Sequence, residues 1–148
     1  MEVQKRFGKH ILELGGNNAI LVAPDADLDM VLQSVVFACA GTAGQRCTTT
    51  RRLILHKSVY DEILARMKTA YAKVLSRIGD PLDEGTLYGP LHSEVAVNEY
   101  KKTLVDAVNA GGKIEFGGKV RSLQQAMSRN CNFQNLPLVF PPSSDHEV

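Results

Sequence analysis

Residues 19–27 read Ala-Ile-Leu-Val-Ala-Pro-Asp-Ala-Asp, a continuous apolar run that ends at a proline and is followed by two aspartates. An apolar run of this length, bounded by a turn signal, is typical of a strand that is covered on both faces. Asp25 and Asp27 offer side chains that can cap a helix, and apolar residues then recur at helical spacing. The stretch therefore predicts a strand over 19–23 and a helix over 28–39.

Further strands and helices follow this pair along the chain. Short apolar runs predict strands at residues 11–14, 52–56 and 113–116, and apolar stripes predict helices at 58–74 and 93–108. This order is α/β, and it predicts a mostly parallel sheet with flanking helices. The periodicity is lost after about Val120, so we expect one domain over 1–120 and a divergent, poorly packed tail over 121–148.

The composition is that of a globular protein, and it argues against several classes of function. The 148 residues carry 17 basic and 16 acidic side chains, so the net charge of +1 indicates neither a nucleic-acid partner nor a membrane surface. No apolar run approaches the roughly 18 residues of a membrane span. The three cysteines are odd in number and widely spaced, which predicts an intracellular compartment, cytoplasmic or mitochondrial. The histidines never pair at metal-ligand spacing, so no metal site is expected.

One cysteine has surroundings that suit a nucleophile. Cys47 follows the small-residue run Gly41-Thr-Ala-Gly44 and precedes three threonines. Reactive cysteines need solvent access and a stabilised thiolate, whereas structural cysteines need only an apolar pocket, as expected for Cys39 on its helix. On residue type alone, Cys47 is either a nucleophile or a partly exposed structural cysteine.

A carboxylate interrupts the apolar run at residues 11–14. An unpaired carboxylate at Glu13 would be costly if it were buried there. Either the alternation of a strand turns Glu13 to solvent and Gly15-Gly16 makes a simple turn, or the carboxylate is held at a strand end as a general base. The segment alone leaves both interpretations open.

Several motifs, in order, resemble the aldehyde dehydrogenase superfamily. Leu12-Glu-Leu-Gly-Gly16 resembles its glutamate motif, and Gly44-Gln-Arg-Cys47 resembles its cysteine motif. Three more signatures match in the same order, at Asp25-Ala-Asp-Leu28, Gly79-Asp-Pro81 and Gly89-Pro-Leu91. The variants found here are similar to the antiquitin branch, the α-aminoadipic semialdehyde dehydrogenases of lysine breakdown, at residues 15–19, 41–49 and 87–92. The resemblance covers residues 3–120.

The resemblance implies NAD-dependent oxidation of a small aldehyde to a carboxylic acid. Cys47 would attack the aldehyde to give a thiohemiacetal and then a thioester, with its backbone N–H helping to hold the oxyanion. Glu13 would activate the water that hydrolyses the thioester. Leu14 and Gly15 match positions whose backbone lies near the nicotinamide. Arg46 matches a contact to the substrate carboxylate in the antiquitin branch; the alternative is a solvated charge beside the cysteine.

The sequence contains only part of what this family uses. In the family the dinucleotide-binding domain comes mainly before the glutamate motif, and no Gly-x-Gly-x-x-Gly turn occurs in this sequence. We therefore expect a partial catalytic domain with little or no NAD-dependent turnover by itself. Two other roles are open: an inactive fragment that pairs through a sheet edge with another copy or a full-length relative, and NAD-independent ester hydrolysis at Cys47.

Overall fold

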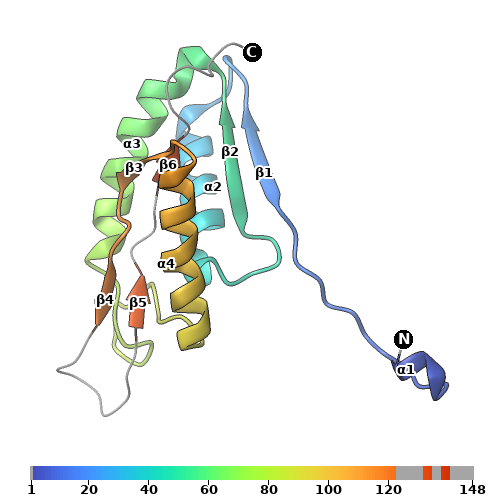
Figure 1. The fold of residues 1–148 in the computed structure, drawn as a ribbon. Coiled ribbons are helices and arrows are strands. Elements are labelled where there is room, and N and C mark those ends of the chain that lie inside the picture. Colours follow the sequence, from blue (N-terminus) through green and yellow to red (C-terminus); the bar gives the residue numbers. More distant parts are fainter. Residues whose placement is uncertain (1, 123–131, 135–137, 141–148) are drawn as a thin grey trace.

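The computed structural model describes residues 2–122, 132–134 and 138–140 (Figure 1). The helices are α1 (Glu2–Lys5), α2 (Leu28–Ala40), α3 (Lys57–Leu75) and α4 (Glu94–Asn109), with a short 3-10 helix η1 (Gly41–Gly44) after α2. The strands are β1 (Asn18–Val22), β2 (Thr50–Leu55), β3 (Lys113–Phe116), β4 (Val120–Ser122), β5 (Asn132–Gln134) and β6 (Leu138–Phe140). None of the described helices is long and apolar enough to cross a membrane.

Two strands that are distant in the sequence pair along one side of the fold. β1 and β2 run in parallel, with Ile20 opposite Leu53 and Val22 opposite Leu55, and α2 connects them (Figure 1). The predicted α/β class with a parallel sheet is therefore confirmed. The other described strands form two antiparallel pairs, β3 with β6 and β4 with β5.

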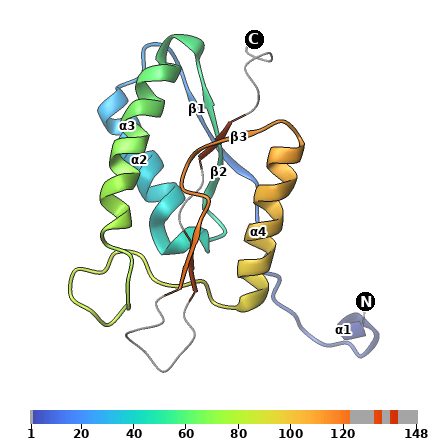
Figure 2. The same cartoon turned by 60° about the vertical axis from the view of Figure 1, so that its left-hand side comes forward.

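The main core lies between the β1–β2 pair, α2 and α3. The α3 residues Ile63, Met67 and Tyr71 are at most 2% exposed and recur every four positions, so one stripe of the helix faces inwards. Val35 of α2 and Val22 of β1 belong to the same cluster. Away from the β1–β2 pair, the strand β3 lies between α3 and α4 in both views (Figures 1 and 2). The core thus anchors both ends of the segment that contains Cys47, α2 before it and β2 after it.

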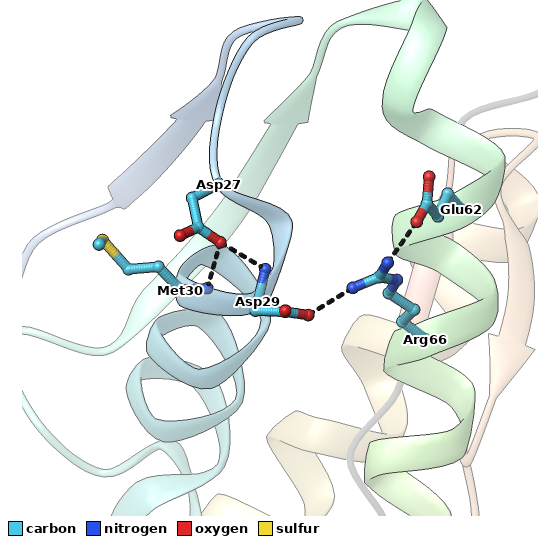
Figure 3. Close-up of polar contacts among 5 residues, drawn as sticks. All are labelled: Asp27, Asp29, Met30, Glu62 and Arg66. Atoms are coloured by element: carbon cyan, nitrogen blue, oxygen red, sulfur yellow. Dashed lines mark hydrogen bonds and ion pairs between the residues drawn. The ribbon is translucent and has the colours of Figure 1, made fainter.

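Polar contacts hold the start of α2 against α3. Asp27 Oδ1 accepts hydrogen bonds from the backbone N–H groups of Asp29, at 3.0 Å, and Met30, at 3.2 Å, so Asp27 is the N-cap of α2. Arg66 of α3 forms an ion pair with Asp29 at 2.7 Å and another with Glu62 on its own helix (Figure 3). These ion pairs are exposed, so they orient the two helices more than they stabilise them.

The predicted strand at residues 11–14 is wrong. Residues 8–17 form neither helix nor strand, and Figure 1 shows the chain leading away from the body of the fold towards α1. The side chains of Ile11 and Leu14 are 87% and 76% exposed. A strand needs a neighbour for its backbone N–H and C=O groups, and no described strand pairs with this segment.

Two finer predictions have different outcomes. Coverage of the run 19–23 on both faces is wrong, because Leu21 is 74% exposed and its partner across the parallel pair, Ile54, is 51% exposed. The tail predicted over 121–148 lies mostly outside the described residues, so its poor packing stays a prediction. The parts that are described form the end of β4 and the strands β5 and β6.

Candidate functional site

Cys47 lies at the corner of a tight turn over residues 46–49, between η1 and β2, which we call the cysteine turn. The N–H of Thr49 donates to the C=O of Arg46 at 3.1 Å and closes the turn. The Thr49 hydroxyl in turn accepts a hydrogen bond from the Arg46 N–H, also at 3.1 Å. Thr49 is 5% exposed, whereas Cys47 is exposed. The turn is therefore anchored at its buried end and presents the thiol to solvent.

Three consecutive residues before this turn have a left-handed backbone. The φ angles are 55° at Thr42, 57° at Ala43 and 71° at Gly44. Left-handed conformation costs about 1–2 kcal/mol for a residue other than glycine. Ala43 is buried in a small apolar cluster with Ala40, Val74 and Tyr88, and this packing offsets the strain. These left-handed residues lead the chain from the end of α2 into the cysteine turn.

The side chain of Arg46 folds back onto the last turns of α2. Its Nη2 donates to the C=O of Phe37 at 2.9 Å, and the guanidinium carbon lies 4.7 Å from the centre of the Phe37 ring. A Cβ at Gly41 would overlap Nη2, so the glycine makes room for the guanidinium. A cation at a helix C-terminus also interacts favourably with the helix dipole. In this arrangement the Arg46 side chain binds the C-terminal end of α2. Its contact to a substrate carboxylate stays a prediction.

Gln45 connects the cysteine turn to the loop at residues 88–92. Its Oε1 accepts a hydrogen bond from the His92 backbone N–H at 2.9 Å and lies 2.9 Å from the His92 Nδ1. Its Nε2 donates to the C=O groups of Thr42, at 3.1 Å, and Pro90, at 3.3 Å. Because a backbone N–H can only donate, Oε1 must face the histidine, and Nδ1 then carries the proton. Sequence reasoning assigned no role to Gln45, although it lies inside the cysteine motif.

Residues 16–18 lie beside the cysteine turn because β1 and β2 run in parallel and start at the same end. Asn18 Nδ2 donates to the C=O of Cys47, at 2.6 Å, and to the C=O of Thr49, at 3.0 Å. Two arginine side chains of β2 also bind this segment. Arg51 donates to the C=O of Gly16 and Arg52 to the C=O of Asn17, each at 2.7 Å. The only signal for these contacts in the sequence was the Gly-Gly-Asn-Asn run at residues 15–18, part of the stretch 15–19 that is similar to the antiquitin branch.

The predicted partners of Cys47 before β1 lie in the exposed segment. Glu13, Leu14 and Gly15 are exposed and belong to neither helix nor strand. Among the described residues, the Glu13 carboxylate makes no hydrogen bond or ion pair, and none joins it to the Cys47 thiol. The structure thus brings the end of the glutamate motif to the cysteine turn without bringing the two reactive groups into contact.

The described residues leave room beside Gly15 but offer no site for the pyrophosphate of a dinucleotide. Open space surrounds Gly15, so a flat nicotinamide ring could approach its backbone. A pyrophosphate needs free N–H groups at a helix N-terminus, usually behind a glycine-rich turn. In the described chain the three long helices are capped at their N-termini by their own side chains, those of Asp27, His56 and Ser93. Nor does the described part hold a group of His, Cys, Asp or Glu side chains that could bind a metal ion.

Comparison with known sequences identifies close relatives. The profile of the aldehyde dehydrogenase family matches residues 1–141. A putative aldehyde dehydrogenase family 7 member A1 homolog of Caenorhabditis elegans is 64% identical over 132 residues, which are 89% of this chain and 24% of that protein. The α-aminoadipic semialdehyde dehydrogenase of Rattus norvegicus is 54% identical over 118 residues, 80% of this chain and 22% of that protein. The chain spans about a quarter of the length of these curated relatives.

Solved structures share the fold. A structure of Gox0499 superposes with a TM-score of 0.78 at 34% identity, over 98% of this chain and 30% of that one. Lactaldehyde dehydrogenase from Escherichia coli has a TM-score of 0.79 at 26% identity, over 92% of this chain and 27% of that one. The resemblance to the antiquitin branch is confirmed by the relatives in sequence, and the fold by those in structure. The chain belongs to the aldehyde dehydrogenase family.

Proposed function

We propose that this chain carries the cysteine and glutamate part of a site that oxidises an aldehyde to a carboxylic acid. The observation that supports it best is the parallel pair, which holds the segment after Glu13 against the closed turn that exposes Cys47. The rat relative is named for α-aminoadipic semialdehyde, and we propose the same aldehyde here. A cytoplasmic or mitochondrial compartment is proposed from the cysteine pattern alone.

The backbone around Cys47 suits nucleophilic attack. The Cys47 thiolate would form a C–S bond with the aldehyde carbon, and the carbonyl oxygen would become an oxyanion. In a trans peptide the N–H points opposite to the C=O, and the Arg46 C=O points to Thr49. The Cys47 N–H therefore points out of the turn, and it has no hydrogen-bond partner among the described residues. An outward N–H beside the thiol can stabilise the oxyanion.

The later steps need groups that lie farther from the thiol. Glu13 would act as the general base that activates water for thioester hydrolysis. Its approach requires movement of residues 8–15 while Gly16 and Asn17 stay bound to β2. The oxidation between attack and hydrolysis needs a hydride acceptor, which is NAD in this family, and Leu14 and Gly15 would meet its nicotinamide end. Because the described residues offer no pyrophosphate site, we propose that this chain by itself performs the cysteine chemistry and not the complete oxidation.

Ester hydrolysis tests the cysteine chemistry independently of the cofactor. The chain is expected to hydrolyse p-nitrophenyl acetate, and Cys47→Ala should lower the rate at least about tenfold because the acyl acceptor is lost. Cys39→Ala, which removes a thiol from the core and not from the turn, is the matched control and should keep the rate. NADH formation from an aldehyde is expected to be absent or very slow. Equal hydrolysis by the chain and its Cys47→Ala variant would overturn the proposal.

A second role is supported by exposed apolar side chains. Leu21 and Ile54 form an uncovered face on the β1–β2 pair, and Phe7, Ile11 and Leu12 are exposed before it. Apolar surface of this kind is a common feature of interaction sites. A fragment that pairs with another copy or with a full-length relative fits this surface. Light scattering at several concentrations tests self-pairing: association that Leu21→Thr with Ile54→Thr weakens would support it, and a monodisperse monomer would argue against it.

A further inference from the structure

We propose that Asn18 is a positioning residue for Cys47, whose carboxamide holds the cysteine turn closed so that the thiol and the Cys47 N–H face solvent together. The inference rests on the proposed role of Cys47 as a nucleophile. Asn18 stands at the start of β1, 29 positions before Cys47 in the sequence. Its Nδ2 has two hydrogens, and each is used, one by the C=O of Cys47 at 2.6 Å and one by the C=O of Thr49 at 3.0 Å.

The two bonds of Asn18 complete the restraint of the Cys47 backbone. Thr49 fixes the peptide plane before Cys47, because its N–H donates to the Arg46 C=O at 3.1 Å. Asn18 fixes the peptide plane after Cys47 by binding the Cys47 C=O at 2.6 Å. A peptide unit is planar, so holding the planes on both sides restrains both backbone dihedrals of Cys47. The direction of the Cys47 N–H, relative to the thiol, therefore depends on Asn18 as well as on the turn itself.

The neighbours of Asn18 show that its carboxamide has a defined place. A Cβ at Gly16 would lie 2.8 Å from Asn18 Oδ1, so the second glycine of the glutamate motif leaves room for this side chain. Asn17 is the natural contrast. It is exposed, its backbone C=O accepts from Arg52 at 2.7 Å, and its side chain makes no hydrogen bond within the described residues. Asn18 is thus half-buried and bound to the cysteine turn, whereas Asn17 is exposed and its side chain makes no such contact.

Amide hydrogen exchange at Thr49 measures whether Asn18 closes the turn. The Thr49 N–H is expected to exchange about five- to tenfold faster in Asn18→Ala, because loss of the amide donor loosens the bond to Arg46. Asn18→Asp, which keeps the shape and removes both donors, should behave the same way. Asn17→Ala should leave the rate unchanged, and core amides of α3 report any loss of global stability. Unchanged Thr49 exchange in both Asn18 variants would overturn the proposal.

Two reactions of the same thiol separate positioning from mere exposure. Acylation by p-nitrophenyl acetate passes through an oxyanion and needs the Cys47 N–H, whereas alkylation by iodoacetamide forms no oxyanion. Asn18→Ala is expected to lower the ratio of acylation to alkylation at Cys47 at least about fivefold, and Asn17→Ala should keep it. Faster Thr49 exchange with an unchanged ratio contradicts the positioning role. If the unmodified chain is not acylated at Cys47 at all, the proposed function fails, and faster Thr49 exchange still assigns closure of the turn to Asn18.

Discussion

A side chain at position 41 would clash with the guanidinium of Arg46. Gly41 has φ −53° and ψ 132°, a conformation open to any residue, so only the nearby guanidinium disfavours a side chain there. We expect Gly41→Ala to lower the free energy of unfolding by about 1–2 kcal/mol, because it displaces Arg46 from the Phe37 C=O and ring. In the Arg46→Ala background the same change should cost little. Urea unfolding of the unmodified chain, the two single variants and the double variant measures this coupling. If the losses in unfolding free energy of the single variants add up in the double variant, the coupling is contradicted.

Cys39 and Cys47 should differ strongly in reactivity. Burial raises the pKa of the Cys39 thiol, and a hydrogen bond with Tyr71 opposes the rise only in part. Because the thiolate is the nucleophile, Cys39 is slowed by both its pKa and its limited access, whereas Cys47 is exposed. At about pH 8 iodoacetamide should modify Cys47 at least about tenfold faster than Cys39. Peptide mapping after timed quenching gives both rates, and similar rates would refute the contrast.

The sequence predicts some of the site residues better than others. The exposure of Cys47 follows from its small and polar neighbours, which are local. The contacts of Asn18 and Arg46 depend on carbonyl groups that lie 29 and 9 positions away along the chain. Only the folded backbone brings those carbonyls near. Residue type alone could therefore suggest the nucleophile but not the groups that hold its turn.

Among the elements, the start of α2 gives a prediction with a control inside the same turn. The sequence offered Asp25 and Asp27 as caps, and only Asp27 accepts hydrogen bonds, from the N–H groups of Asp29 and Met30. Asp27→Ala should therefore lower the free energy of unfolding by about 1 kcal/mol. Asp25→Ala, which removes the same charge from an exposed side chain, should have a much smaller effect in thermal unfolding. Equal effects would show that charge and not capping decides.

The contact between α3 and β3 predicts a pH dependence of stability. Hydrogen bonds from Lys113 and then Lys68 lower the pKa of Glu115. Since the folded pKa lies below the unfolded value of about 4.3, the stabilisation is present above that pH and is lost as the pH falls through the folded pKa. The chain should thus be more stable than Glu115→Gln near about pH 6, and the difference should shrink below about pH 4. Urea unfolding across this range tests it, and a constant difference would contradict it.

Elements with a strong local pattern were predicted within a few residues. β1, α2 and α3 lie close to the ranges expected from apolar runs and stripes, because both signals arise from neighbouring residues. The strand predicted at residues 11–14 does not form, because a strand also needs a partner strand. The antiparallel pairing of β3 with β6 was missed for another reason: β6 lies in a part of the chain with no clear period, so no strand was expected there.

For the whole molecule, the order of elements was enough to predict the class of fold. A strand, a helix and a second strand predict a parallel pair with a helical connection, and β1, α2 and β2 form one (Figure 1). What the order could not show is how much surface the chain leaves uncovered. Leu21 and Ile54 on the outer face of the pair are exposed, and the chain matches about a quarter of the length of its curated relatives. The cysteine chemistry is therefore the part of the family activity to test first.

Covalent trapping of the thiol shows directly whether Cys47 is the nucleophile. The chain is incubated with p-nitrophenyl acetate, quenched in acid and mapped by peptide mass spectrometry. We expect an acetyl group on the peptide that contains Cys47, formed faster than on any other peptide and absent in Cys47→Ala. Acetylation that spares Cys47, or that proceeds equally at the half-buried Cys39, would contradict it.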